Sequence, residues 1–106
     1  LLAITVLCAL ITEAASNVAT ATIFMPIAAT LALGANYDPA IAALAAAMAA
    51  NLGFANPAAT SSNALVYSTG RVPIAAMLKT GLWIDAVGAV LIALACAYIV
   101  PLLPLR

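Results

Sequence analysis

Polar residues interrupt this apolar chain at two places, and their chemistry suits the binding of ions. The first cluster spans residues 12–20 (TEAASNVAT) and the second spans residues 56–63 (NPAATSSN), and each contains a Ser-Asn pair. Hydroxyl, amide and carbonyl oxygens are the ligands that a hard cation such as Na⁺ prefers. The free N–H groups of an exposed helix end suit an anion. We therefore expect the two clusters to bind a cation and an anion.

The composition limits the class of protein. Of the 106 residues, 68% are hydrophobic and 6% are charged, and the mean hydropathy is +1.26. Because a soluble domain carries roughly 25% charged residues, we expect an integral protein of the plasma or inner membrane, embedded in the lipid bilayer. The net charge is zero and the chain has no His, which argues against nucleic-acid partners and His-based catalysis. With no nucleophile–base pair or phosphate loop visible, we expect no catalytic residue, no metal site other than one for sodium, and no enzyme.

The acidic residues and the helix breaks each allow a second interpretation. Glu13 is the only carboxyl that the sequence places deep in the membrane, where an ionisable group is a functional candidate by default. It could take up a proton for coupling, but we favour a role in bracing the first cluster. Asp85 is expected near a membrane interface, in a structural role. The polar side chains could instead only join helices by hydrogen bonds; two Ser-Asn clusters at breaks favour a binding site.

The first cluster lies in the middle of an apolar block, residues 1–33. As one straight helix this block would be ~50 Å long, well beyond a hydrocarbon core of ~30 Å. Dividing it at the Ser-Asn pair gives two arms of about 15 residues, ~22 Å each, which are too short to cross. We therefore predict a re-entrant helical hairpin with its polar tip at residues 12–20. The alternative is a tilted spanning helix with a buried polar patch.

The second cluster interrupts another apolar segment, residues 39–70. Asp38 is a predicted N-cap before this helix, and its many alanines allow close approach of other helices. Pro57 and the small residues around it predict a loop over residues 53–63. Helix can resume around Ala64. We predict one broken transmembrane helix with its break near mid-depth.

A third segment, residues 74–104, is predicted to begin as a short amphipathic surface helix and to continue from about Trp83 as the terminal transmembrane helix. Pro101 and Pro104 are predicted to end this helix. The positive-inside rule places Arg71 and Lys79 in the cytoplasm and the C-terminus outside. The fold class is therefore an all-α membrane protein. Because the chain begins with Leu inside an apolar run, we expect the C-terminal piece of a larger protein.

The two clusters carry a family resemblance. Residues 12–20, followed by IFMPI at 23–27, resemble the second Ser-Asn-Thr/Val signature of the divalent anion/sodium symporter family. Residues 56–67 (NPAATSSNALVY), then GRV at 70–72 and MLKTG at 77–81, are similar to that family's Pro-Ala-Thr-Pro-Pro-Asn-Ala segment and the loop after it. The resemblance covers nearly the whole chain, in order and spacing.

This resemblance implies the C-terminal part of an inverted-repeat, sodium-coupled secondary transporter of dicarboxylates, citrate or related divalent anions. It also implies a missing N-terminal half with a pseudo-symmetric site, and a homodimer when the protein is complete. The residues that the resemblance places around sodium are Thr12, Ala15, Asn17 and Ala59. Those that it places around the substrate are Ser16, Asn17, Val18, Thr60 and Ser61.

Two departures from the family pattern bear on the substrate. Val18 stands where many bacterial members have Thr, and Ser61-Ser62 stands where Pro-Pro is usual. Three functions stay open at this point. The leading one is a sodium-coupled symporter. The alternatives are a proton-coupled antiporter or anion/arsenite permease of the same superfamily, and a non-transporting membrane scaffold subunit.

Overall fold

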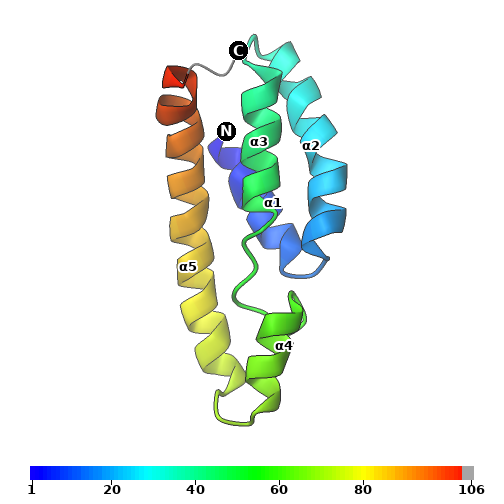
Figure 1. Cartoon of the computed structure of the whole chain (residues 1–106), viewed down its shortest axis with the longest axis vertical. Helices are drawn as coiled ribbons and strands as arrows, with labels where there is room; N and C mark the ends of the chain where they lie inside the picture. Colours follow the sequence, from blue (N-terminus) through cyan, green and yellow to red (C-terminus); the bar gives the residue numbers. More distant parts are fainter. Residues whose placement is uncertain (104–106) are drawn as a thin grey trace.

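The fold is entirely helical, as the sequence predicts. The computed structural model describes residues 1–103, and this part contains helices and turns without a strand (Figure 1). Pro104, predicted to end the last segment, lies outside the described residues. The five α-helices are α1 (Leu2–Thr12), α2 (Asn17–Gly34), α3 (Pro39–Ala49), α4 (Ser61–Ser68) and α5 (Ile74–Leu94), and α5 continues as a π-helical turn, η1 (Ala95–Ile99), and a 3₁₀ turn, η2 (Val100–Leu102).

Helices α1 and α2 form a hairpin that turns back inside the molecule. The Ser16 side chain caps α2, because its Oγ accepts the N–H of Ala19 at 3.1 Å. The turn lies beside the unwound segment that follows α3, and not at either end of the long axis (Figure 1). With 18 residues, α2 is ~27 Å long, which exceeds the arm of about 15 residues expected from the sequence.

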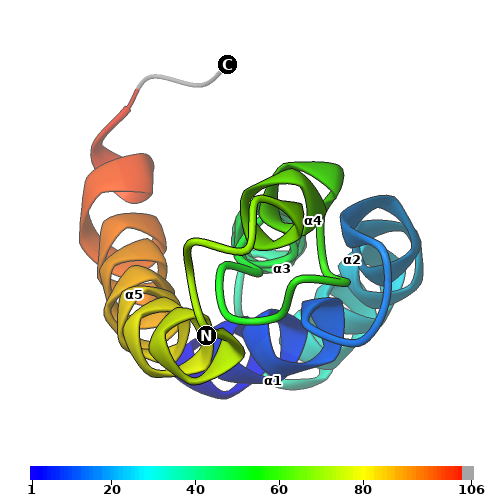
Figure 2. The ribbon, with the colours of Figure 1, turned by 90° about the horizontal axis from the view of Figure 1, so that it is seen from below.

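Helix α3 begins as its sequence indicates and packs through alanine. Asp38 Oδ1 accepts the N–H of Ala40 at 2.8 Å and that of Ile41 at 3.4 Å, and Pro39 occupies the first turn. The core contains mainly small side chains, which let the helices approach closely. Helix α2 packs along α3, and α1 contacts both α3 and α5 (Figure 2). The buried residues that form this core are Cys8, Ala28, Ala32, Ala42, Ala46 and Ala49.

The large apolar side chains point outward. Leu10, Leu31 and Trp83 have exposed fractions of 59%, 64% and 68%. An apolar surface this extensive must face lipid or other protein. Helix α2 and the continuous helical stretch Ile74–Leu102 are both long and apolar enough to cross a membrane. The distribution of side chains is therefore that of an integral membrane protein.

The second half of the chain follows the long axis. Helix α3, an unwound segment and α4 succeed one another, and α5 then returns along their full length (Figure 1). Helix α4 begins at Ser61 with Thr60 as N-cap, three residues before the predicted resumption at Ala64, because Thr60 Oγ1 accepts the N–H of Asn63 at 3.1 Å. No helix boundary separates the predicted amphipathic start from the segment after Trp83, because one helix covers both; the position of that start at the membrane surface stays a prediction.

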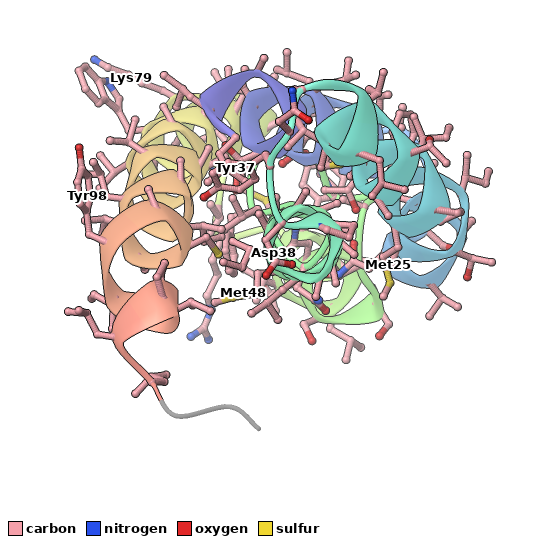
Figure 3. All side chains as sticks on the ribbon, turned by 90° about the horizontal axis from the view of Figure 1, so that it is seen from above. Met25, Tyr37, Asp38, Met48, Lys79 and Tyr98 are labelled. Atoms are coloured by element: carbon pink, nitrogen blue, oxygen red, sulfur yellow. The ribbon has the colours of Figure 1, made fainter. Side chains whose placement is uncertain are left out.

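Helix α5 runs without a break from Ile74 to Leu94, since no Pro or polar run interrupts it. Asp85 accordingly lies in its middle and not near its start. Lys79 and Tyr98 lie on the outer side of the α5 column, away from the other helices (Figure 3).

Candidate functional site

The two helix breaks meet at Thr12, the last residue of α1. Its side chain is fully buried. Thr12 Oγ1 lies 2.6 Å from Asn17 Oδ1 and 2.8 Å from the carbonyl oxygen of Ala50, just beyond the end of α3. A hydroxyl carries one proton, so Thr12 can donate to only one of these oxygens. The Thr12 hydroxyl thus joins the hairpin turn to the end of α3, and oxygen atoms from both breaks lie around it.

Gly53, in the unwound segment, is the point at which three predicted sodium ligands meet. A Cβ built on Gly53 would lie 3.4 Å from Thr12 Cγ2, 3.6 Å from Ala59 Cβ and 3.6 Å from Asn17 Oδ1. Its φ of +140° is open to glycine and strained for other residues. Ala15, the fourth predicted ligand, lies half-buried in the hairpin turn, with its N–H bonded to Ile11 O.

The residues predicted to face the substrate cap two helices. Ser16 is the N-cap of α2 and Thr60 is the N-cap of α4. The first N–H groups of each helix have no partner within it, so both ends offer donors and a partial positive charge. Val18 has an exposed fraction of 76%, and Ser61 is also exposed. The two predicted sets therefore differ in setting: the sodium set is largely buried and the substrate set is largely open.

Thr20 is one turn along α2 from Ser16 and Asn17, and its setting is unusual. It has an exposed fraction of 1%, and in the described residues its Oγ1 is the one buried side-chain oxygen or nitrogen without a hydrogen-bond partner. Thr22 and Thr30, farther along the same helix, bond carbonyls of their own helix. The start of α2 thus holds a buried oxygen that no group among the described residues satisfies.

Glu13 braces the unwound segment. Its Oε1 accepts the N–H of Ala55 at 3.0 Å, and its Oε2 accepts the N–H of Asn56 at 2.6 Å. Its carbonyl oxygen also accepts Asn56 Nδ2 at 3.0 Å. The bracing therefore runs from the hairpin to a different segment, and not only within the hairpin tip.

Asp85 is more buried than the sequence suggests. It has an exposed fraction of 5%, so it is buried among the helices, and Glu13 is not the only carboxyl that bonds the unwound segment. Asp85 Oδ1 accepts the N–H of Gly53 at 3.1 Å, and both its carboxylate oxygens lie 3.3 Å from the N–H nitrogen of Phe54. The sequence signal for Asp85 is the same as for Glu13: an acidic residue inside an apolar helix is a functional candidate. The rule was not applied to Asp85, because the transmembrane part was predicted to start only two residues before it.

The Asn residues of the two Ser-Asn pairs have different partners, although the two pairs look alike in the sequence. In the first pair, Asn17 faces Thr12. In the second, Asn63 Nδ2 donates to the carbonyl oxygens of Gly53 at 2.7 Å and Asn56 at 3.0 Å. Asn63 therefore closes the unwound segment against the start of α4.

Gly81 of α5 lets this helix press against the unwound segment. A Cβ at Gly81 would lie 2.2 Å from Ala55 Cα and 2.4 Å from Ala55 N. Non-bonded atoms do not approach a Cβ this closely, so only glycine fits at this position. Sequence reasoning missed this residue, because nothing local distinguishes it from a glycine at an ordinary helix contact.

The sequence matches one described protein family over residues 1–105, the sodium:sulfate symporter transmembrane region. The chain belongs to this family. The chain is 40% identical over 100 residues to the sodium-dependent dicarboxylate transporter SdcS of Staphylococcus saprophyticus. This match covers 94% of the chain and 19% of the relative. The chain is 38% identical over 91 residues to SdcS of Staphylococcus aureus, covering 86% of this chain and 18% of the relative.

The symporter-family chain therefore spans about a fifth of the length of the curated relatives that it matches. No solved structure matches it. The family is one of transporters and not of enzymes.

Proposed function

We propose that this chain is the C-terminal part of a sodium-coupled secondary transporter of dicarboxylates, citrate or related divalent anions. The observation that carries the proposal is the buried oxygen cluster of Thr12, Asn17 and Ala50, where two helix breaks meet. Interrupted helices whose ends face one another are the usual ion and substrate sites of secondary transporters. The match to the symporter family and to sodium-dependent dicarboxylate transporters supports the same function.

Sodium would be held by neutral oxygens. Thr12 and Asn17 offer side-chain oxygens, and Ala15 and Ala59 offer carbonyls only. Neutral ligands suit a transported ion, because they can release it without leaving a bare carboxylate in a medium of low dielectric. The proximity of Thr12 Cγ2, Asn17 Oδ1 and Ala59 Cβ to the position of a Cβ on Gly53 supports a shared site for these three residues.

The anion would bind at the helix ends capped by Ser16 and Thr60, with Val18 and Ser61 exposed beside them. Cation and anion then stabilise each other, since opposite charges attract strongly where water is excluded. Because such coupling is reciprocal, sodium would raise the affinity for the anion and the anion would raise the affinity for sodium. This mutual effect is what a symporter requires.

The arrangement in the membrane belongs to the same proposal. The hairpin would be re-entrant, with Arg71 and Lys79 on the cytoplasmic side and the C-terminus outside. The rest of the protein would supply an inverted repeat with a second polar hairpin, and the whole would form a homodimer.

The test is uptake of labelled succinate by the intact transporter in proteoliposomes. An inward sodium gradient should drive uptake, and a potassium or proton gradient should not. Asn17→Ala should raise the half-saturating sodium concentration by about tenfold, as expected for loss of one polar contact to a charge. Asn51→Ala is the matched control, because the exposed Asn51 amide bonds only Ala47 O of its own helix.

Each other outcome supports a different function. Uptake driven by a proton gradient alone would support a proton-coupled permease and contradict the proposal. A normal rate and normal sodium dependence in Asn17→Ala would remove this cluster from the site. If uptake by Asn17→Ala falls only as much as the amount of assembled protein falls, the polar residues at the helix breaks serve helix association and not ion binding.

A further inference from the structure

We propose that Asp85 of α5 is a positioning residue for the sodium site and that it sets sodium affinity through the backbone of Gly53. The inference rests on the proposed function, since it concerns the same site. No predicted ligand lies on α5, and Asp85 accepts N–H groups of the unwound segment, beside the carboxyl of Glu13.

Asp85 holds the residue around which the site is built. Its Oδ1 accepts the N–H of Gly53 at 3.1 Å, while the carbonyl oxygen of Gly53 accepts Asn63 Nδ2 at 2.7 Å. Both polar groups of Gly53 are therefore bonded to side chains from other elements. Because glycine has no Cβ, its backbone has many alternative conformations, and these two bonds help to select the one with a φ of +140°.

The position of Gly53 controls the spacing of the proposed ligands. Thr12 Cγ2, Asn17 Oδ1 and Ala59 Cβ all lie within ordinary contact distance of where its Cβ would be. Side chains packed this closely follow a shift of the backbone beneath them. A displacement of Gly53 would therefore change the separation between the hairpin oxygens and the Ala59 carbonyl.

Two carboxylates divide the unwound segment between them. Asp85 takes the N–H groups of Gly53 and Phe54, and Glu13 takes those of Ala55 and Asn56. Glu13 belongs to the hairpin and Asp85 to α5, so four consecutive N–H groups join these two elements. Gly81 allows α5 to approach this closely. Helix α5 is therefore linked to the proposed ion site through the four residues 53–56 of the unwound segment.

The experiment measures sodium on the intact transporter in two ways, by the half-saturating concentration for uptake and by the thermal stabilisation of purified protein on adding sodium chloride over potassium chloride. Asp85→Ala should raise the half-saturating sodium concentration by about tenfold or more, the effect of losing a hydrogen bond to a charged acceptor. Asp85→Asn keeps one acceptor oxygen and should raise it by about threefold. At saturating sodium, the half-saturating succinate concentration should change by less than about twofold, because Asp85 does not touch the substrate set.

Asp38→Ala is the matched control. Asp38 also accepts two backbone N–H groups, but at the start of α3. Its loss should lower the melting temperature and leave the half-saturating sodium concentration unchanged.

The inference is overturned if Asp85→Ala and Asp85→Asn behave like Asp38→Ala, with lower stability and unchanged sodium dependence. If Asp85→Ala does not fold, Asp85→Asn decides alone by the same comparison. Failure of the proposed function gives a different result: the wild-type protein then shows no sodium dependence, or Asn17→Ala leaves that dependence unchanged.

Discussion

Thr12 Oγ1 lies 2.6 Å from Asn17 Oδ1, across the turn that joins α1 to α2. The same hydroxyl lies 2.8 Å from Ala50 O, so it also connects the hairpin to the end of α3. The contact identifies Thr12 as the residue through which the proposed site can be altered most sharply.

Replacement of Thr12 by valine keeps the shape of the side chain and removes its oxygen. We expect Thr12→Val to raise the half-saturating sodium concentration for uptake by about tenfold and to lower stability by ~1–2 kcal/mol. Thr12→Ser should restore most of the sodium affinity. Thr30→Val is the control, because the exposed Thr30 hydroxyl bonds only carbonyls of α2; an equal effect there would contradict a specific role.

Replacement of Glu13 by glutamine tests the brace. The two carboxylate oxygens accept the N–H groups of Ala55 and Asn56, but a glutamine amide has one oxygen and would point its own N–H groups at the second donor. We expect Glu13→Gln to lower stability by ~1–3 kcal/mol, measured as a fall in the melting temperature of the intact transporter. A melting temperature equal to that of the wild type would show that the brace is dispensable.

The close approach of α5 can be tested at Gly81. The added methyl group of Gly81→Ala would overlap the Ala55 backbone, so α5 or the unwound segment must move. We expect a loss of ~3 kcal/mol or more, seen as low yield of folded protein. Gly34→Ala serves as control, because a Cβ there would have no atom within 4 Å. Normal yield and melting temperature in Gly81→Ala would mean that the contact is looser than described.

Val18 offers a test of the anion side. It has an exposed fraction of 76% at the start of α2, so a hydroxyl added there would be accessible to a bound anion. We expect Val18→Thr to leave the melting temperature unchanged and to lower the half-saturating concentration of succinate by about threefold to tenfold, the effect of one added hydrogen bond. Competition by sulfate and citrate should be measured on the same variant. Kinetics identical to those of the wild type would place the anion away from Val18.

Local signals were enough to predict the ends of several helices. The polar run at residues 12–20 contains the turn between α1 and α2, and Asp38 caps α3 as its type and its following proline indicate. These features depend on neighbours in sequence. The membrane depth of the hairpin tip stays a prediction.

The contacts that build the site could not be predicted in the same way. Asp85 and Gly53 are separated by 32 residues along the chain, and the fit of Gly81 against Ala55 depends on how two helices pack. The prediction that the transmembrane part starts at about Trp83 put Asp85 near an interface, which removed the reason to ask what it bonds. An apolar sequence carries little information on helix register, because alanine and leucine are acceptable at most positions.

The most direct test of the central claim is a structure of the intact transporter determined in sodium and again with sodium replaced by potassium. We predict ion density between Thr12, Asn17 and the carbonyl of Ala59 in sodium, and loss of that density in potassium. If the structure in saturating sodium shows no ion density beside Gly53 and the same direct contact between Thr12 and Asn17, sodium does not bind at this site and the central claim is contradicted.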